Sequence, residues 1–446
     1  MYLKRDKFLV VGISRSGVAI TEALLKRGAK CYVYDDSESE TVKAAENNLA
    51  EKGATVVYRS EVAELLNEIT VVVLSPGIPI DHDIPVRARK LGKRITGELD
   101  LASEFCLSPK IAVTGTNGKT TTCTMIENVL SAAGIDAKLC GNAGTPLSSV
   151  LDSLTENSVA VCETSSFQLE TAYRFYPHIA VVTNVTPDHL SRHYNMENYV
   201  YLKKKILSNL RESEYAVLNY DDPTVKNFGE NTRAKVVYFS AKTEVNGAYV
   251  AEGKVFYKGK YITDVNTLPI SGEHNVLNLL ATVCVAEIMG VGEETIVESV
   301  RGFKGVKHRI QYVRTLSGVD YFNDSKATNS DATIKAIDAM TKPTILILGG
   351  KDKGLEFKEL FSRISNSKVR SVVLTGESRE RMFLAANEEG YKNVSVVYDF
   401  EMAVEFASMI AEEGDAVLLS PACSSFDRFA DYEERGNKFI ELVESL

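Results

Sequence analysis

Short apolar runs alternate with helical patterns along almost the whole chain, and this alternation is the strongest constraint on its fold. Residues 8–11 are predicted to form a buried strand, residues 18–27 a helix that ends at Gly28, and residues 30–34 the next strand. Strand–helix–strand units of this kind are joined by right-handed crossovers and build parallel sheets. The pattern therefore predicts an α/β fold with mainly parallel sheets.

The alternation begins three times, which predicts three domains. A second series starts at Lys110 and a third near Val306. The length of 446 residues agrees, because one domain typically takes about 150 residues. Within the second series, the glycine-punctuated residues 240–269 are predicted to add antiparallel strands. We expect domains at residues 1–106, 107–304 and 305–446.

Charge and cysteine content argue against several classes of protein. Lys plus Arg number 51 and Asp plus Glu number 60, so the net charge is −9, which disfavours general nucleic-acid binding. The 7 cysteines are odd in number and lack C-x-x-C spacing, which argues against a disulfide framework or a zinc site. No stretch approaches the roughly 18 apolar residues of a membrane span, and the N-terminal apolar run is too short for a signal peptide. We expect a cytoplasmic protein that binds neither membrane nor nucleic acid.

Residues 114–122, Thr-Gly-Thr-Asn-Gly-Lys-Thr-Thr-Thr, are the most specific motif of the chain. They follow a predicted strand and precede a predicted helix, so backbone N–H groups and a helix N-terminus can cradle phosphate oxygens. Lys119 would neutralise the β and γ phosphates, and the hydroxyl of Thr120 or Thr121 would ligate Mg²⁺. The glycine spacing departs from the strict P-loop pattern. The residues predicted to surround the phosphates are Gly115, Thr116, Asn117, Gly118, Lys119, Thr120 and Thr121.

Residues 12–17 resemble a dinucleotide-binding turn after the first strand. Ser14 stands where the second glycine normally lets the backbone approach a pyrophosphate, which disfavours NAD. Asp35 or Asp36 is placed where an acidic residue would meet a ribose hydroxyl. The turn is therefore either a structural connection or a site for another nucleotide.

Other polar residues carry weaker signals on their own. Glu163 follows a predicted strand beside the phosphate loop, where it could hold Mg²⁺ directly or through water, although such residues are more often solvated strand ends. His189 lies in a predicted loop, and residues 203–205 are three lysines that alone would form a solvated helix face. Cys423 has no histidine in its motif, so we do not expect a nucleophile there.

Together these motifs resemble the Mur ligase family over nearly the whole chain. Residues 420–436 most resemble the branch of the family that adds D-glutamate. The other matching segments are the ATP loop at 114–120, the metal-ligand element at 163–170, the Asn-x-x-x-Asp-His element at 184–189, the adenine-side helix start at 272–278, and the nucleotide contacts at 308–309 and 323–329.

The resemblance implies a fold and a reaction. It implies a UDP-binding Rossmann-like domain, a central P-loop ATPase domain with a mainly parallel sheet, and a C-terminal Rossmann-like domain that binds the amino acid. The carboxylate of UDP-N-acetylmuramoyl-L-alanine would attack the γ-phosphate of ATP, and the amine of D-glutamate would attack the resulting acyl phosphate. Such a monomeric ligase would serve cytoplasmic peptidoglycan precursor synthesis, and through it cell wall biogenesis, cell shape and cell division.

The resemblance also implies roles for residues. Lys119, His189 and Lys203 would be catalytic, with Lys203 as a carbamate and Lys204 as its fallback. Two Mg²⁺ ions would be served by Thr120, Glu163, His189 and the carbamate of Lys203. Beyond the phosphate loop, ATP would contact Asn275, Asn278, Arg309 and Asp324, with His274 and Lys326 nearby. The UDP substrate would contact Ser14, Arg15, Ser16, Asp35, Asp36, Gly77 and Asn142. D-Glutamate would contact Thr328, Lys353, Ser425, Phe426 and Tyr432, the last in place of a common Phe.

Three alternatives stay open. A sister enzyme, either another Mur-type ligase or folylpolyglutamate synthase, shares the ATP loop but not the block at 420–429. An NAD-dependent dehydrogenase with two Rossmann-like domains conflicts with Ser14 and with the lysine–threonine run after Gly118. A nucleotide-binding module without chemistry is the third alternative.

Overall fold

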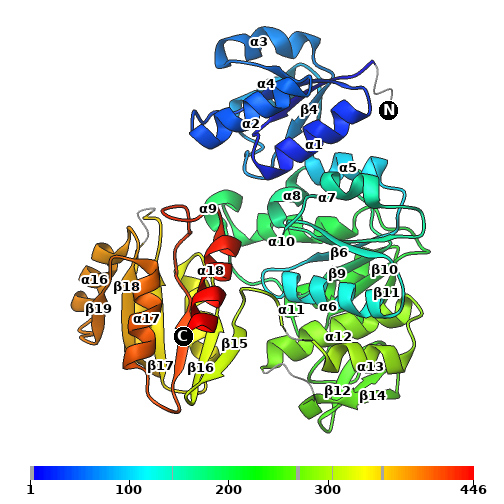
Figure 1. The fold of residues 1–446 in the computed structure, drawn as a ribbon. Coiled ribbons are helices and arrows are strands. Elements are labelled where there is room, and N and C mark those ends of the chain that lie inside the picture. The colour runs from blue at the N-terminus through cyan, green and yellow to red at the C-terminus, as the bar shows by residue number, and fades with distance from the viewer. Residues whose placement is uncertain (1–4, 143, 268–271, 304, 353–355) are drawn as a thin grey trace. The chain divides into compact units, whose positions relative to one another are not determined.

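The computed structural model describes residues 5–142, 144–267, 272–303, 305–352 and 356–446. The chain divides into two compact units, Met1–Phe303 and Lys304–Leu446. Among the described residues, the first unit contains a five-stranded and a nine-stranded sheet, and the second a six-stranded sheet (Figure 1). All three sheets are mainly parallel, which confirms the predicted α/β class. The boundaries after residues 106 and 304 stay predictions.

The N-terminal sheet is parallel throughout, with strand order β3-β2-β1-β4-β5. Phe8 and Val10 of β1 face one side and Leu9 and Val11 the other, and all four are buried, so helices cover both faces. The elements are β1 (Lys7–Val11), α1 (Arg15–Lys26), β2 (Lys30–Tyr34), α2 (Glu40–Glu51), β3 (Thr55–Val56), α3 (Arg59–Glu68), β4 (Val71–Leu74), α4 (Asp83–Lys90), β5 (Arg94–Gly97) and α5 (Glu98–Phe105).

The central sheet has the order β14-β13-β12-β11-β10-β9-β6-β8-β7. The predicted antiparallel addition is confirmed, because β12–β13 and β13–β14 are antiparallel pairs. The elements are β6 (Lys110–Thr114), α6 (Lys119–Ala132), β7 (Ala137–Gly141), α7 (Leu147–Val150), η1 (Leu151–Ser153), β8 (Val159–Glu163), α8 (Ser166–Glu170), β9 (Ile179–Val182), α9 (Leu190–His193), α10 (Met196–Lys204), η2 (Lys205–Leu207), β10 (Tyr215–Asn219), α11 (Pro223–Lys226), η3 (Asn227–Asn231), β11 (Lys235–Ser240), β12 (Ala248–Ala251), β13 (Lys254–Tyr257), β14 (Lys260–Asp264), η4 (Val265–Thr267), α12 (Glu273–Ile288) and α13 (Glu293–Arg301).

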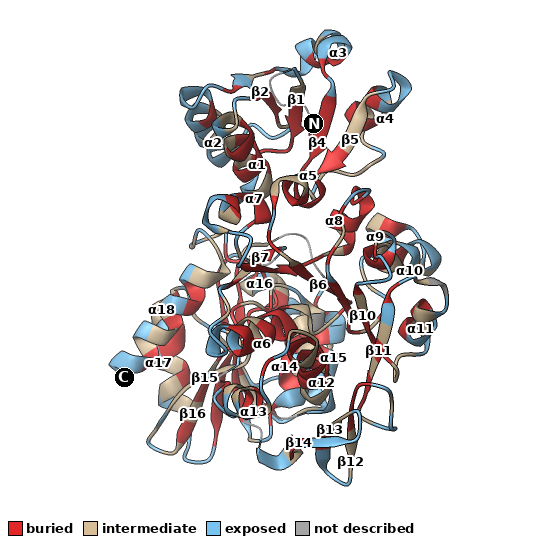
Figure 2. Cartoon of the chain, turned by 90° about the vertical axis from the view of Figure 1, so that its right-hand side faces the viewer, coloured by how far each residue is buried: buried red, intermediate tan, exposed pale blue. Residues whose placement is uncertain are grey.

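Both faces of the central sheet are covered. Ile111 and Val113 of β6 pack in one cluster with residues of α6, α12 and α13, whereas Ala112 packs in a second cluster on the opposite face. The side chains of β4 and β6 are all buried, as the red strands of Figure 2 show. Strands buried on both faces are mainly apolar, which explains the continuous runs in the sequence. Lys110 at the start of β6 is buried with its Nζ donating to the carbonyl oxygens of Cys106 and Ser108. The seven cysteines are free thiols and are buried.

The second unit has the strand order β15-β16-β20-β17-β18-β19, and only the β15–β16 pair is antiparallel among its described strands. No helix in the described parts of the whole chain has the length and apolarity to cross a membrane. The elements are β15 (Gln311–Leu316), β16 (Val319–Asn323), α14 (Ser330–Ala339), β17 (Thr344–Gly349), α15 (Lys358–Ser365), β18 (Val369–Thr375), α16 (Arg379–Glu388), β19 (Val394–Val396), α17 (Phe400–Ile410), β20 (Ala416–Leu419) and α18 (Tyr432–Ser445).

The buried carboxylate of Asp100 on α5 joins the two sheets of the first unit. Its Oδ1 accepts hydrogen bonds of 2.7 Å from the backbone N–H groups of Arg174 and Phe175. Its Oδ2 accepts one of 2.8 Å from the hydroxyl of Thr96. Because a buried carboxylate must have such partners, Asp100 fixes the chain that follows α8 against α5.

Asp100→Ala is expected to destabilise the first unit by about 3 kcal/mol, because a buried and a partly buried backbone N–H group lose their acceptor. Urea unfolding should show a lower midpoint. Asp152→Ala is the matched control, since Asp152 also links the two sheets through ion pairs with Lys26 and Arg27 but is 56% exposed. That change should cost at most about 1 kcal/mol. Equal losses in the two variants would contradict the role assigned to Asp100.

Candidate active site

The phosphate loop leaves the carboxyl end of β6, between the neighbouring strands β8 and β9. Gly118 caps the N-terminus of α6 with φ of +83°. A Cβ at Gly118 would lie 2.3 Å from Oδ1 of Asn278, and one at Gly115 would lie 1.9 Å from Oγ1 of Thr183. Both glycines are therefore required by close packing as well as by backbone geometry. The loop and the N-terminus of α6 form a ready cradle for phosphate.

The lysine side chain of the loop folds back over its backbone. Nζ of Lys119 donates to the carbonyl oxygens of Gly115, at 2.9 Å, and Thr116, at 2.8 Å. The backbone N–H of Asn117 donates to Oδ1 of Asn184, at 2.9 Å, which ties the loop to the chain after β9. The loop therefore holds a positive charge beside the positive end of the α6 dipole, an arrangement suited to an anion.

Glu163 is the last residue of β8 and is 3% exposed. Its Oε1 accepts a 2.8 Å hydrogen bond from Nδ2 of Asn142, but its Oε2 is buried without a hydrogen-bond partner in the described structure. An orphaned carboxylate oxygen fits a hard cation such as Mg²⁺. Thr120, in the first turn of α6, adds a hydroxyl. No three His, Cys, Asp or Glu side chains gather as a metal centre within the described ranges, so phosphate and water oxygens would complete the shell.

Lys203 on α10 is 1% exposed, and its Nζ donates to the carbonyl oxygen of Gly115 at 2.8 Å. The same oxygen accepts from Lys119. Burial, and then the charge of Lys119, hold the pKa of Lys203 well below its ordinary value. The ammonium also lies 4.7 Å from the ring centre of Tyr199. Of the three consecutive lysines, Lys203 is thus the one that faces the phosphate loop.

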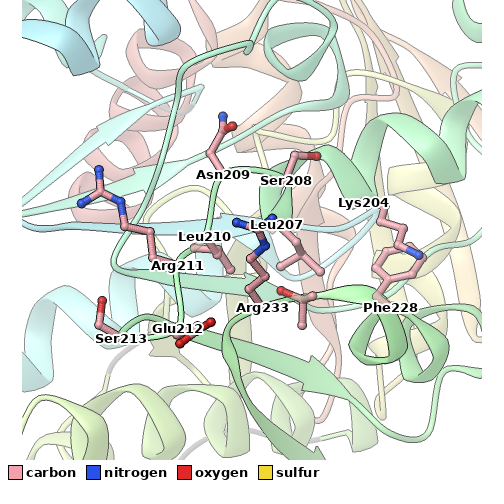
Figure 3. A pocket seen from close by; sticks show the side chains of 11 residues that line it. Lys204, Leu207, Ser208, Asn209, Leu210, Arg211, Glu212, Ser213, Phe228 and Arg233 are labelled. Atoms are coloured by element: carbon pink, nitrogen blue, oxygen red, sulfur yellow. The ribbon is translucent and has the colours of Figure 1, made fainter.

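Lys204 points elsewhere, with Nζ 5.6 Å from the ring centre of Phe228. It lines a surface hollow of about 840 Å³ together with Leu207, Arg211 and Arg233 (Figure 3). No described residue that lines this hollow belongs to the phosphate loop. The hollow is therefore separate from the candidate active site.

His189 precedes α9 and has a left-handed backbone, with φ of 53°. Its ring centre lies 4.9 Å from that of Phe167, and its Nε2 is 3.4 Å from Oδ2 of Asp188. The side chain is half-exposed, so it can turn toward a ligand. On α12, Asn278 accepts from the hydroxyl of Thr122, and its Nδ2 donates to Oδ1 of Asn275. The structure thus places Asn275 and Asn278 beside the phosphate loop.

Six of the seven residues predicted to hold the UDP group follow β1, β2 or β4, and the seventh, Asn142, follows β7. Ser14 is the N-cap of α1, followed by Arg15 and Ser16 in its first turn. Arg15 donates to the carbonyl oxygen of Gly144, at 2.9 Å, in the same region as Asn142. Gly77 belongs to the chain after β4. One edge of a parallel sheet where the strand order reverses is the usual place for a nucleotide.

Asp35 and Asp36, the two acidic candidates of this domain, already have hydrogen-bond or ion-pair partners. Oδ2 of Asp35 accepts from the backbone N–H of Ile13 at 2.8 Å, so Asp35 shapes the turn between β1 and α1. Asp36 lies 2.9 Å from Nε2 of His82 and 3.4 Å from Arg59. Both carboxylates lie at the carboxyl end of β2, at the sheet edge where the UDP site is predicted. Asp35 also has a structural role.

In the second unit, Asp324 follows β16 and is buried. Its Oδ2 accepts from the hydroxyl of Ser420, at 2.7 Å, and its Oδ1 from the N–H of Ile310, at 3.2 Å. Burial raises the pKa of Asp324 to about 7, although these hydrogen bonds and the charge of Arg309 oppose the rise. The charge of Arg309 thus acts on Asp324, and the contacts of both residues to a nucleotide stay a prediction.

Three of the predicted D-glutamate residues, Ser425, Phe426 and Tyr432, lie between the carboxyl end of β20 and the start of α18. Ser425 is 2% exposed, whereas Phe426 is 62% exposed. Tyr432 begins α18, and Nζ of Lys326 lies 5.6 Å from its ring centre. Thr328 is half-buried in the chain between β16 and α14. Lys353 lies outside the described residues.

Sequence reasoning gave no role to Arg192, Glu170, Tyr199 or Arg435. Arg192 forms an ion pair with the buried Glu170, and the hydroxyl of Tyr199 lies 3.1 Å from that of Thr116. Arg435 is 2% exposed and holds the chain around Ser325 through Nε. Arg192 and Tyr199 lie within ten residues of His189 and Arg435 within the block at 420–436, but a single sequence cannot distinguish them from surface residues.

Gly118→Ala is expected to weaken ATP binding about tenfold or more, because the new methyl group must displace Asn278 or the loop. Gly134→Ala is the matched control, since Gly134 has φ of +78° but open space around its Cβ position. Alanine at a positive φ should lower the free energy of unfolding of both variants by about 1–2 kcal/mol. The two variants are therefore compared by their affinity for ATP. Calorimetric titration with ATP measures it. Equal ATP affinity in the two variants would contradict the packing argument.

Comparison with known proteins agrees with this arrangement. Three family models match the chain in order: the Mur ligase MurD-like N-terminal domain at residues 6–97, the Mur ligase middle domain at 113–286, and the Mur ligase glutamate ligase domain at 308–423. Solved structures with the same fold include the UDP-N-acetylmuramate–alanine ligase MurC from Thermotoga maritima, 20% identical, with a TM-score of 0.60 over 98% of this chain and 99% of that one. A pseudomurein peptide ligase type C from Methanothermus fervidus is 19% identical, with a TM-score of 0.57 over 99% of each chain.

Full-length relatives are more similar in sequence. A UDP-N-acetylmuramoylalanine–D-glutamate ligase from Caldanaerobacter subterraneus subsp. tengcongensis is 42% identical, and the match covers 100% of both chains. One from Streptococcus suis is 41% identical over 100% of this chain and 98% of the relative. The chain therefore belongs to the Mur ligase family.

Proposed function

We propose that this chain is an ATP-dependent ligase that joins D-glutamate to UDP-N-acetylmuramoyl-L-alanine through an acyl phosphate, in peptidoglycan precursor synthesis. The observation that carries the proposal is the meeting of the phosphate loop, the orphaned oxygen of Glu163 and the buried Lys203 at one sheet edge. The proposed substrates come from the names of the full-length relatives, which contain UDP-N-acetylmuramoylalanine and D-glutamate.

In the first step two anions must approach each other, the carboxylate of the UDP-linked substrate and the triphosphate of ATP. Phosphoryl transfer depends mainly on positioning and on neutralised charge. Lys119 lies where it can leave the loop carbonyls and bind phosphate oxygens. When bound beside Glu163 and Thr120, Mg²⁺ would supply further positive charge. The N-terminal domain would hold the UDP group through Ser14, Arg15, Ser16, Asp35, Asp36 and Gly77, with Asn142 from the central domain.

The second step needs a bound amino acid. The amine of D-glutamate would attack the acyl phosphate, and phosphate would leave as the amide bond forms. Ser425 and Thr328 offer hydroxyl groups to the two carboxylates, and Phe426 and Tyr432 offer ring surfaces. Lys353 is proposed as the cationic partner. Arg309 and Asp324 would contact the phosphate and ribose of ATP.

Lys203 is proposed to carry a carbamate. Its lowered pKa favours the neutral amine, which can add CO₂ with formation of a C–N bond and loss of a proton. The product is an anion and a hard oxygen ligand, suited to support a second Mg²⁺ with His189. Charge also favours the change, because an anion beside Lys119 replaces a second cation on the Gly115 oxygen.

In the presence of Mg²⁺, release of phosphate from ATP is expected only when UDP-N-acetylmuramoyl-L-alanine and D-glutamate are both present. Omitting either one, or replacing them with L-alanine, a diamino acid or a folate, should give background rates. Turnover with one of the replacements would indicate a sister ligase, and NAD⁺ reduction with a hydroxy acid would indicate a dehydrogenase.

Lys203→Ala is expected to lose most activity, and added formate or acetate should restore part of it by supplying a carboxylate. Lys204→Ala is the matched control, because Lys204 is on the same helix but faces the hollow beside Phe228. It should retain near-normal turnover without added acid. Full activity of Lys203→Ala, or rescue in the Lys204 variant alone, would reject the assignment.

A further inference from the structure

Arg192 is a partly buried cation that the proposed chemistry does not use. It lies in α9, three residues after His189, and its side chain is 17% exposed. Nε donates to Oε1 of Glu170 at 3.0 Å, and Nη2 donates to Oε2 at 2.7 Å. This two-point contact with a carboxylate that is 5% exposed is the strong form of an ion pair.

The guanidinium also donates to the N-terminal domain. Nη1 donates to the carbonyl oxygen of Gly77 at 3.2 Å, and Nη2 to that of Ile78 at 3.0 Å. Nη2 also lies 3.5 Å from the oxygen of Pro76. One planar fork thus binds a carboxylate of the central domain and successive carbonyl groups of the loop after β4. A lysine has a single nitrogen and cannot bridge both sets.

A chain of side-chain contacts connects the pair of Arg192 and Glu170 to the phosphate loop. The guanidinium lies 5.2 Å from the ring centre of Phe167, and His193 lies 3.4 Å from Glu170 and stacks on Tyr199 with ring centres 5.4 Å apart. The hydroxyl of Tyr199 lies 3.1 Å from that of Thr116. Burial, followed by the charge of Arg192, lowers the pKa of His193 to about 4.

We propose that Arg192 is a positioning residue that fixes the substrate loop at residues 75–79 against the phosphate loop. The inference rests on the proposed function, in which that loop holds the UDP-linked substrate. Phosphoryl transfer then needs the substrate carboxylate at a set distance from the γ-phosphate, which is bound on the other domain. Arg192 supplies this alignment without touching either ligand, so its loss should reduce turnover more than it reduces binding.

The test compares Arg192→Ala, Arg192→Lys and Tyr194→Phe. Tyr194 is the matched control because its hydroxyl also links α9 to the N-terminal domain, through Asp81, but the residue is 71% exposed. Arg192→Ala should lower kcat about tenfold or more, since small misplacement of reacting groups costs that much. The KM for ATP and the calorimetric Kd for UDP-N-acetylmuramoyl-L-alanine should change little. Arg192→Lys should fall between, and Tyr194→Phe should match the wild type.

Amide hydrogen exchange of Ser75, Gly77 and Ile78 without ligands provides a second measurement that does not depend on the substrate. Exchange should rise in Arg192→Ala and stay unchanged in Tyr194→Phe. Unchanged exchange in Arg192→Ala, or a kcat loss shared by Tyr194→Phe, would overturn the inference. The inference would also be overturned if the loss of kcat followed the melting temperature across the three variants. A wild-type chain without turnover would instead reject the proposed function, while the exchange result would still decide whether Arg192 fixes the loop.

Discussion

Two lysines share one carbonyl oxygen at the centre of the candidate active site, and much of the surrounding structure follows from that contact. Lys119 and Lys203 both donate to the oxygen of Gly115. Two ammonium groups this close repel each other strongly in a site shielded from water. Lys203 is the more deeply buried, and burial together with the charge of Lys119 lowers its pKa. The site therefore favours one cation and one neutral amine, which is the state that can react with CO₂.

The architecture was predictable because it follows from local patterns. The middle of β6, residues 111–113, is buried on both faces of its sheet and is apolar at each position, so the alternation of apolar runs and helices predicted the α/β class. The phosphate loop was predictable because glycine, lysine and threonine have separate physical tasks at fixed positions after a strand. Neighbouring carboxyl ends of parallel strands then bring Glu163 to the same edge as the loop.

Other parts of the site were not predictable, because they depend on contacts between distant residues. Lys203 and Lys204 are neighbours of one residue type, and only packing sends the first to Gly115 and the second to Phe228. Arg192 binds carbonyl groups that are more than a hundred positions away. A backbone carbonyl leaves no trace in the identity of its residue. Such partners therefore cannot be read from one sequence.

The segment between His189 and Tyr194 links these observations. It is a helix of only 4 residues, and both flanking residues have left-handed φ values, 53° and 67°. So short a helix is not stable alone, and each left-handed residue costs roughly 1–2 kcal/mol. The segment must then be held by tertiary contacts, chiefly the hydrogen bonds of Arg192 and the buried ring of His193. The backbone geometry of His189 consequently depends on the same contacts that position the substrate loop. The loop at residues 75–79 and the backbone of His189 therefore rest on one set of contacts around α9.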